Sequence, residues 1–203
     1  MPYLLAFFGY LLGSVPFGLL YGKLAGIDVR QEGSRNIGAT NVGRLLGKKL
    51  GALTLASDTL KGLLPMLLAT WLLAEWPDCQ RWTMLTGAAA FLGHCFPLYL
   101  KFRGGKGVAT ALGIHLYLAP IPTLAAVGLF ALTVRLSGYV SLGSLIAAAA
   151  LPLLIWLTGN PLELVLISLL IGLVIWLKHH ENLARLLRGQ EKSWKKTDAE
   201  KNR

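Results

Sequence analysis

The sequence predicts an all-α integral membrane protein with about seven transmembrane helices, and three observations support this fold class. Hydrophobic residues make up 54% of the 203 residues and the mean hydropathy is +0.56, which is more apolar surface than one soluble core can bury. Long segments such as 51–74 are apolar on every side over about the twenty residues that a bilayer requires. No alternating pattern of a β-barrel is visible, so helices are expected to satisfy the backbone inside the membrane.

Six apolar runs give the expected helices in chain order. The first run lacks a basic region before it and a convincing cleavage site, so it is expected to be a retained span rather than a signal peptide. No soluble domain, heptad pattern or convincing internal repeat is present. We therefore expect a single membrane-embedded domain over residues 1–203, with a short basic cytoplasmic tail from about residue 192. The runs cover residues 3–22, 51–74, 82–100, 108–135, 139–157 and 161–177.

The distribution of charge predicts the orientation of the chain. Residues 23–50, 101–107 and 178–203 together hold 17 of the 20 lysines and arginines. Because cytoplasmic loops of membrane proteins are rich in these residues, we expect all three stretches in the cytoplasm, with the N-terminus periplasmic and the C-terminus cytoplasmic. The formal net charge of +10 then belongs to membrane loops, and no nucleic-acid partner is expected.

This orientation requires an even number of crossings between residues 107 and 178. The sequence Pro120-Ile121-Pro122 interrupts the run at 108–135 near its middle, because proline breaks helices. If the run crosses the membrane twice, the total is seven spans, two of them short. The alternative is one long proline-kinked helix combined with a re-entrant segment elsewhere.

The stretch GSRNIGATN, residues 33–41, is polar and rich in glycine. Gly33 and Gly38 allow backbone amides to turn toward a ligand, while Arg35 and Arg44 add positive charge. This chemistry suits an oxyanion such as phosphate. An ordinary cytoplasmic loop has a similar composition and is the alternative. Further hydrogen-bond donors come from the side chains of Ser34, Asn36, Thr40 and Asn41.

A second polar stretch, GHCFPLYLKFRGGKGVAT, covers residues 93–110. Its glycines surround Lys106 just before an expected helix, so a helix N-terminus, bare amides and an ammonium group can converge on one anion. The spacing is not that of a Walker A motif. Arg103 and Lys106 are otherwise interfacial anchors at a helix end. The glycines are Gly104, Gly105 and Gly107.

A third stretch, KHHENLARLLRGQE, follows the last span at residues 178–191. It contains His179, His180 and Asn182, and then an amphipathic pattern of leucines. The alternative to a functional role is a surface helix that ends at Gly189. The histidine pair lacks accompanying ligands at suitable spacing, so no metal is expected.

Two charged residues and one histidine fall inside expected spans. Asp58 and Lys61 are three residues apart, so they share a helix face and can pair, where either alone costs about 2.5–3.5 kcal/mol. They bind substrate or brace the helix bundle. His94 lies about 10 Å from the end of its span and needs a polar partner. Cys79 and Cys95 show no CxxC pattern, so neither a disulfide nor a zinc site is expected.

Taken in order, SVPFG (14–18), GSRNIGATN, GHCFP…FRGGKGVAT and HHENLARLLRGQE resemble the bacterial acyl-phosphate:glycerol-3-phosphate acyltransferase family over nearly the whole chain. The resemblance implies transfer of a fatty acyl group from acyl phosphate to the 1-hydroxyl of glycerol 3-phosphate, without a cofactor. It also implies a seven-helix inner-membrane protein with cytoplasmic motifs, and a functional link to the enzyme that produces acyl phosphate. The HxxxxD motif of other acyltransferases is absent.

The same resemblance implies the site residues. Ser34, Lys106, His179 and Asn182 are expected to be catalytic, and Arg35 and His180 stand where relatives vary. The proton acceptor is His179, His94 or a substrate phosphate, and Ser34 as a covalent nucleophile is a rival mechanism. A membrane transporter for a small phosphorylated solute and a lipid-phosphate phosphatase are rival functions. The substrate-binding set is Ser34, Asn36, Thr40, Asn41, Arg44, His94, Arg103, Gly104, Gly105, Lys106, Gly107 and Glu191, with Asp58 and Lys61 as an intramembrane charge pair.

Overall fold

The computed structural model describes residues 1–195, and these residues form α-helices and one short 3-10 helix without any strand. The chain folds into two compact units, Met1–Leu118 and the described residues from Ala119 onward. The first unit contains α1 (Pro2–Gly13), α2 (Phe17–Leu24), α3 (Ala39–Leu46), α4 (Lys48–Leu72), α5 (Cys79–Cys95), η1 (Leu98–Leu100) and α6 (Val108–Leu118). The second contains α7 (Pro120–Ser137), α8 (Val140–Leu157), α9 (Leu162–Lys178) and α10 (His180–Leu187).

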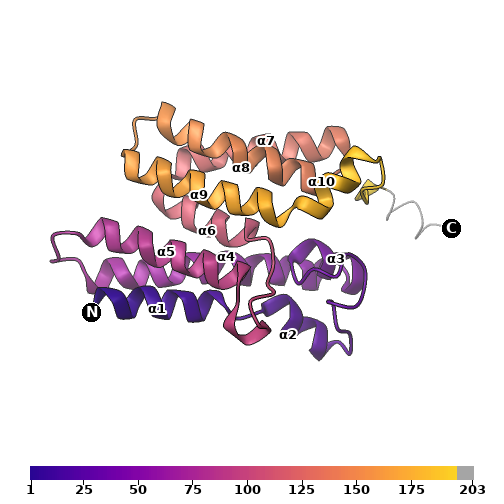
Figure 1. Ribbon diagram of the computed structural model, residues 1–203, viewed down its shortest axis with the longest axis horizontal. Coiled ribbons are helices and arrows are strands. Elements are labelled where there is room, and N and C mark those ends of the chain that lie inside the picture. Colours follow the sequence, from indigo (N-terminus) through magenta and orange to yellow (C-terminus); the bar gives the residue numbers. More distant parts are fainter. Residues whose placement is uncertain (196–203) are drawn as a thin grey trace. The chain divides into compact units, whose positions relative to one another are not determined.

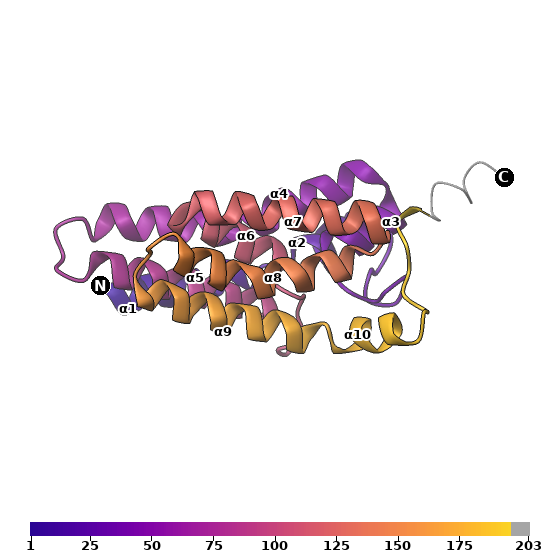
Figure 2. The same ribbon diagram turned by 90° about the horizontal axis from the view of Figure 1, so that it is seen from above.

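Small residues bring the helices of the first unit close together. In both views α1, α4 and α5 run side by side, and α6 packs against α4 (Figure 1 and Figure 2). A Cβ atom added to Gly9 of α1 would lie 2.7 Å from the carbonyl oxygen of Thr86 on α5, and one added to Gly13 would strike the carbonyl of Ala90. Burial of apolar side chains does not drive helices together inside lipid. Membrane helices therefore associate through small residues that let their backbones pack closely.

Two apolar runs are divided where proline removes a backbone donor. The first run, expected to be one helix, breaks at residues 14–16 into α1 and α2, because Pro16 has no N–H to continue α1. The run at 108–135 breaks at Ala119, immediately before Pro120, as the proline doublet predicts. Since α6 has 11 residues, it spans about 16 Å, about half of a hydrocarbon core. Two crossings of this run stay a prediction.

In the second unit α7, α8 and α9 lie side by side (Figure 1). The indole N–H of Trp176 on α9 donates to the carbonyl of Leu145 on α8, over 3.1 Å. At His179 the chain bends by 59° from α9 into α10. α10 therefore leaves the direction of α9.

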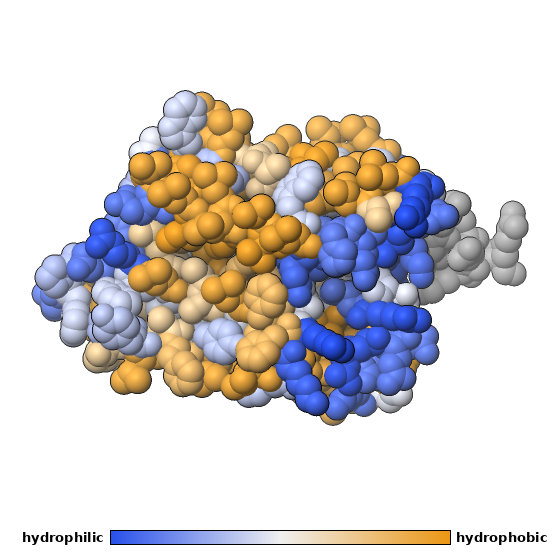
Figure 3. Space-filling model, viewed as in Figure 1, coloured by the Kyte–Doolittle hydropathy of each residue, from blue (hydrophilic) through white to orange (hydrophobic). Residues whose placement is uncertain are grey.

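Five candidate spans are long and apolar enough to cross a bilayer: Pro2–Leu24, Lys48–Leu72, Cys79–Leu100, Pro120–Ser137 and Val140–Leu157. The bent pair α9 and α10 gives up to six, and α6 is shorter. Large hydrophobic side chains on these helices are exposed, as for Trp71 (75%) and Leu170 (63%). Hydrophobic residues cover much of the face drawn in Figure 3, whereas hydrophilic residues gather around α2 and α3 of the first unit. The chain is a multi-pass membrane protein.

The count of seven spans, the orientation of the termini and the single domain stay predictions. Of the basic tail expected from about residue 192, residues 192–195 belong to the structure and residues 196–203 lie outside the described part of the chain.

Candidate functional site

The first polar loop is folded around the side chain of Asn41. This residue lies in the first turn of α3 and is buried. Its amide nitrogen donates to the carbonyls of Val29 (3.0 Å), Glu32 (3.2 Å) and Asn36 (2.9 Å), and its amide oxygen accepts from the N–H of Ser34 (2.8 Å). One side chain thus fixes the loop at several points. These bonds use both amide hydrogens, so the structure shows Asn41 shaping the loop rather than reaching an anion as predicted.

Backbone conformation in this loop depends on glycine. Gly33 has φ +64°, which L-residues rarely adopt, and a Cβ there would press on the amide oxygen of Asn41. Asn36 accepts the N–H of Gly38 over 2.9 Å, a local turn that leads into α3. Ser34 and Arg44 are half-buried, and Thr40 is exposed.

An ion pair that the sequence analysis did not predict lies just before the first polar loop, residues 33–41. Arg30 donates from Nε (2.9 Å) and from an Nη (2.6 Å) to the two carboxylate oxygens of Asp28. Hydrogen bonds from the Arg30 side chain, then from its backbone N–H, lower the pKa of Asp28 to about 2. In the sequence, the spacing of two residues between Asp28 and Arg30 was the signal that could have predicted this ion pair.

The glycine-rich loop lies against the last turn of α5. The N–H of Gly104 donates to the carbonyl of Cys95 (3.3 Å), and that of Gly105 donates to His94 (3.1 Å). The expectation of bare amides is therefore wrong for these two glycines. Gly107 has φ +81°, and a Cβ there would meet the ring of Phe91. Lack of side chains lets the loop approach α5.

Lys106 lies between Gly105 and Gly107, two residues before the start of α6. It is half-buried, whereas Arg103 is exposed. Because α6 begins at Val108, the ammonium group and the positive end of a helix belong to the same short segment. The predicted convergence of helix N-terminus and lysine is compatible with this backbone.

Charged and polar side chains also meet inside the first unit. Lys61 Nζ lies 2.8 Å from Asp58 Oδ1, so the spacing of three residues on α4 does produce the expected pair. Lys61 also donates to the carbonyl of Val15 over 2.9 Å. His94 Nδ1 lies 3.7 Å from the same Asp58 oxygen, a charge contact that is too long for a hydrogen bond.

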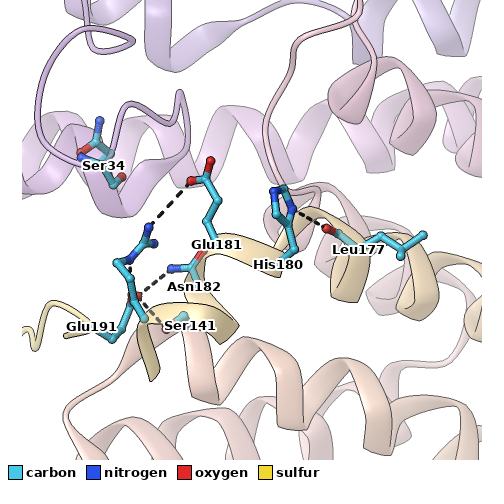
Figure 4. A network of polar contacts seen from close by, with 9 residues as sticks. Ser34, Ser141, Leu177, His180, Glu181, Asn182 and Glu191 are labelled. Atoms are coloured by element: carbon cyan, nitrogen blue, oxygen red, sulfur yellow. Dashed lines mark hydrogen bonds and ion pairs between the residues drawn. The ribbon is translucent and has the colours of Figure 1, made fainter. Parts of the chain in front are cut away.

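In the second unit Glu191 organises the residues of the third motif, as Figure 4 shows. Its Oε1 accepts hydrogen bonds from Asn182 (2.6 Å) and Ser141 (2.8 Å), and its Oε2 accepts one from Arg185 Nε (2.7 Å). Partial burial alone raises the pKa of Glu191, but the hydrogen bonds from Arg185, Asn182 and Ser141 outweigh it and lower this pKa. A carboxylate here is stable in its ionised form.

Glu191 reaches these partners because α10 ends in a tight reversal. Gly189 has φ +66°, the N–H of Gln190 donates to Arg185 (2.8 Å), and the N–H of Gly189 donates to Leu186 (3.1 Å). These two bonds define a Schellman motif, which turns the chain back along the helix. The predicted helix end at Gly189 is confirmed.

The residues after Glu191 are tied to the turn between α7 and α8. The N–H of Trp194 donates to the carbonyl of Gly138 over 3.0 Å. Gly138 has φ +79°, and a Cβ there would lie 2.6 Å from the hydroxyl of Ser193. We call residues 191–195 the C-terminal strap.

His179 stands at the bend between α9 and α10. Its Nδ1–H donates to the carbonyl of Ile175 over 2.8 Å. A neutral imidazole with a proton on Nδ1 carries its lone pair on Nε2, so Nε2 is the atom suited to accept a proton. His180 also donates from Nδ1, to Leu177 (2.9 Å), but its side chain is exposed.

The predicted residues thus assemble into local groups. Asn41 holds the loop of Ser34 and Asn36, and Asn182 contacts Glu191 directly. Asp58, Lys61 and His94 form a third group, which adjoins Gly105 through the His94 ring. Ser141 and Arg185 were missed by sequence reasoning: Ser141 is separated from Glu191 by 50 residues, whereas Arg185 is three residues beyond Asn182, a spacing that places both on one helix face. No group of three or more His, Cys, Asp or Glu side chains within residues 1–195 is arranged to hold a metal ion.

The family model and two similar relatives point to one protein family. The family model described as glycerol-3-phosphate acyltransferase matches residues 3–189. The glycerol-3-phosphate acyltransferase of Desulfotalea psychrophila is 52% identical over 196 residues, covering 97% of this chain and 100% of the relative. That of Trichlorobacter lovleyi is 53% identical over 186 residues, covering 92% and 94%.

Two solved structures are also similar to this chain. Both are crystal structures of PlsY (YgiH), an integral membrane glycerol 3-phosphate acyltransferase, at 39% identity. The glycerol 3-phosphate form superposes with a TM-score of 0.89 and covers 95% of each chain. The lysophosphatidic acid form has a TM-score of 0.86 and covers 95% of this chain and 94% of that one. The chain described here belongs to the glycerol-3-phosphate acyltransferase family.

Proposed function

We propose that this protein transfers a fatty acyl group from acyl phosphate to the 1-hydroxyl of glycerol 3-phosphate. The products are inorganic phosphate and lysophosphatidic acid, and the reaction is the first step of phospholipid biosynthesis. The observation that carries this proposal is the similarity, over 95% of the chain, to an acyltransferase whose solved forms are named for glycerol 3-phosphate and for lysophosphatidic acid.

Both reactants carry a phosphate group, so the site needs two sets of cationic and hydrogen-bonding groups. We assign phosphate binding to Ser34, Asn36, Arg44 and Lys106, with Thr40 and Arg103 in supporting contact and Asn41 shaping the loop that carries Ser34 and Asn36. Lysine and arginine are suited to this task because they form charge-assisted hydrogen bonds to phosphate oxygens. Asn182 and His179 orient the glycerol phosphate.

The reaction needs no covalent enzyme intermediate, because phosphate is already a good leaving group. The glycerol oxygen attacks the acyl carbon and a new C–O ester bond forms. The bond from that carbon to the phosphate oxygen then breaks, and the phosphate leaves with its electron pair. Holding both reactants in position can supply about 7–11 kcal/mol of barrier reduction in favourable cases. Lys106 stabilises the negative charge on the departing phosphate.

The proton of the attacking hydroxyl goes to His179 Nε2 in this proposal. The hydrogen bond from Nδ1 to Ile175 supports the assignment, since it holds the imidazole in the tautomer whose Nε2 accepts. Replacing His179 with Gln is expected to lower kcat by about 100-fold and to change KM much less. Equal kcat in the variant would assign the role to His94 or to a substrate phosphate instead.

Attack by Ser34 on the acyl donor is the competing mechanism. It requires an acyl-enzyme, and the donor alone then produces a burst of phosphate that matches the amount of enzyme. Rapid quench followed by mass spectrometry detects such an adduct. With direct attack, phosphate appears only when glycerol 3-phosphate is present.

We place the active site at the cytoplasmic face of the bacterial inner membrane. The basic composition of residues 23–50, 101–107 and 178–203 supports this orientation. Both the soluble acceptor and the enzyme that makes acyl phosphate are then in the compartment where the reaction takes place.

The test is a comparison of acyl donors. Protein purified in detergent is expected to form lysophosphatidic acid and phosphate in equal amounts from acyl phosphate and glycerol 3-phosphate, and to give no product from acyl-CoA. Phosphate release without glycerol 3-phosphate indicates a phosphatase instead. Turnover with acyl-CoA contradicts the proposed donor while leaving the family intact.

A further inference from the structure

A buried carboxylate lies on a membrane-spanning helix of the first unit. Asp58 is ten residues from the start of α4, about 15 Å along the helix. Its exposed fraction is 2%. An ionised group at this depth is costly, and membrane proteins that retain one usually use it.

Lys61 accounts for one of the contacts of this carboxylate. Its ammonium group lies 2.8 Å from Asp58 Oδ1 and donates to the carbonyl of Val15, at the break between α1 and α2. The pair is therefore neutral as a whole and joins two parts of the bundle. It does not explain why His94 lies 3.7 Å from the same Asp58 oxygen.

His94 touches the glycine-rich loop through both its backbone and its ring. Its carbonyl accepts the N–H of Gly105 over 3.1 Å. Its ring packs so closely on Gly105 that Nε2 is the nearest atom to a Cβ added there, well inside contact distance. The position of the His94 ring therefore determines where the backbone of Gly105 can lie. Lys106 is the next residue.

We propose that Asp58 and His94 are positioning residues for the glycine-rich loop, Gly104–Gly107. The carboxylate is the charged neighbour of the imidazole at 3.7 Å, the imidazole ring supports Gly105, and Gly105 sets the direction of the following residue, Lys106. That the loop binds a substrate phosphate rests on the proposed function. The link from Asp58 through His94 to Gly105 rests on the contacts described above. This separates Asp58 from a simple brace between helices.

A brace and a positioning residue respond differently when the charge pair is removed as a unit. The double variant Asp58→Leu/Lys61→Met replaces both groups with apolar side chains of similar size, which buried ion pairs often tolerate. The carbonyl of Val15 still has the N–H of Phe17 as a donor at 3.1 Å. The bundle is then expected to stay folded, while His94 loses its polar neighbour.

Hydrogen exchange of the intact protein in detergent measures the protection of the loop amides independently of enzyme activity. We expect the amides of Gly104 and Gly105 to exchange about tenfold faster in the double variant, with α1 and α4 unchanged. In the same variant KM for a phosphate-bearing substrate should rise about tenfold or more, with a smaller change in kcat. Unchanged exchange and unchanged KM in a folded double variant would falsify the positioning role.

Gly105→Ala tests the same link from the other side. The new methyl group displaces the His94 ring while leaving Asp58 and Lys61 paired, so faster loop exchange and raised KM are again expected. If the double variant does not fold, this variant together with Asp58→Asn decides the question. A loop that exchanges at the normal rate in both would overturn the proposal.

Thr54→Val is the matched control. Thr54 lies on α4 four residues before Asp58, has no exposed surface, and donates its hydroxyl hydrogen only to Leu50 of its own helix among the contacts in the described residues. Loop exchange and KM are expected to stay at normal values. If the unmodified enzyme fails to acylate glycerol 3-phosphate, the proposed function fails, and the exchange data still test the link.

Discussion

At the scale of single residues, several motif side chains shape the backbone, whereas others are proposed to contact the substrate. Asn41 holds the first polar loop through four hydrogen bonds, and Glu191 gathers Asn182, Arg185 and Ser141. Replacing Asn41 or Glu191 also displaces the backbone and the side chains that each of them holds. Loss of activity in these variants therefore does not by itself indicate contact with substrate.

Lys106 is assigned to phosphate contact. We expect Lys106→Ala to lower kcat/KM by about 100-fold or more, because a preorganised charge next to the leaving phosphate is lost. Steady-state kinetics with both substrates measures this change. Lys49→Ala is the control, since Lys49 is an exposed lysine at the start of α4. Equal losses in the two variants would point to a general effect of charge rather than to a specific contact.

Glu191 predicts a pH dependence of stability. Its folded-state pKa lies below the ordinary value of 4.5, so its hydrogen bonds stabilise the protein fully above that value and are lost as pH falls through the lower folded pKa. The difference in thermal midpoint between the unmodified protein and Glu191→Gln should be constant from about pH 6 to pH 8 and shrink below about pH 4.5. A difference that grows on acidification contradicts this account.

At the scale of elements, the ends of helices decide where the C-terminal strap lies. Both α7 and α8 are followed by glycines with positive φ, Gly138 (+79°) and Gly159 (+71°). At Gly138 an added Cβ meets Ser193 of the strap, whereas nothing lies within 4 Å of a Cβ at Gly159. The two positions share a backbone requirement and differ in contact with the strap.

Gly138→Ala and Gly159→Ala are therefore a matched pair. Each costs about 1 kcal/mol for the left-handed backbone, but Gly138→Ala also displaces residues 191–195. We expect faster proteolysis near Trp194 and reduced activity in Gly138→Ala alone. Limited proteolysis with mass spectrometry and turnover rates give the comparison. Similar cleavage in the two variants would mean that the strap does not depend on this turn.

At the scale of the whole molecule, the basic stretches predict the side on which each loop lies. In a Cys79→Ser background, an impermeant thiol reagent added to intact cells should label Asp78→Cys, between α4 and α5. It should label Lys192→Cys only after the cells are permeabilised. The opposite pattern would put the third motif on the wrong side for a cytoplasmic acceptor.

The sequence predicted those features that depend on near neighbours. The spacing of Asp58 and Lys61 gave their pairing, and Pro120 gave the break after α6. Pro16 carries the same information for the break after α1, but the apolar run around it hid the signal. The contact of Ser141 with Glu191 joins residues 50 apart and is created by the folding of the strap, so no local pattern contains it.

The amides of Gly104 and Gly105 show a second limit of sequence reasoning. Glycines beside a lysine suggest an open anion site, yet their N–H groups donate to the end of α5. Whether a backbone donor faces a ligand or the fold depends on the path of the chain between Phe96 and Arg103. That path includes positive φ at Lys101 and Phe102, which composition does not reveal.

The 59° bend at His179 has a consequence for kinetics. It marks the boundary where the apolar α9 gives way to the amphipathic α10, and in the proposed function this is where an acyl donor dissolved in lipid would meet a water-soluble acceptor. The donor concentration that matters is then its mole fraction in the bilayer. Diluting acyl phosphate with inert phospholipid in nanodiscs, at constant bulk amount, should slow turnover in proportion, whereas adding buffer should not.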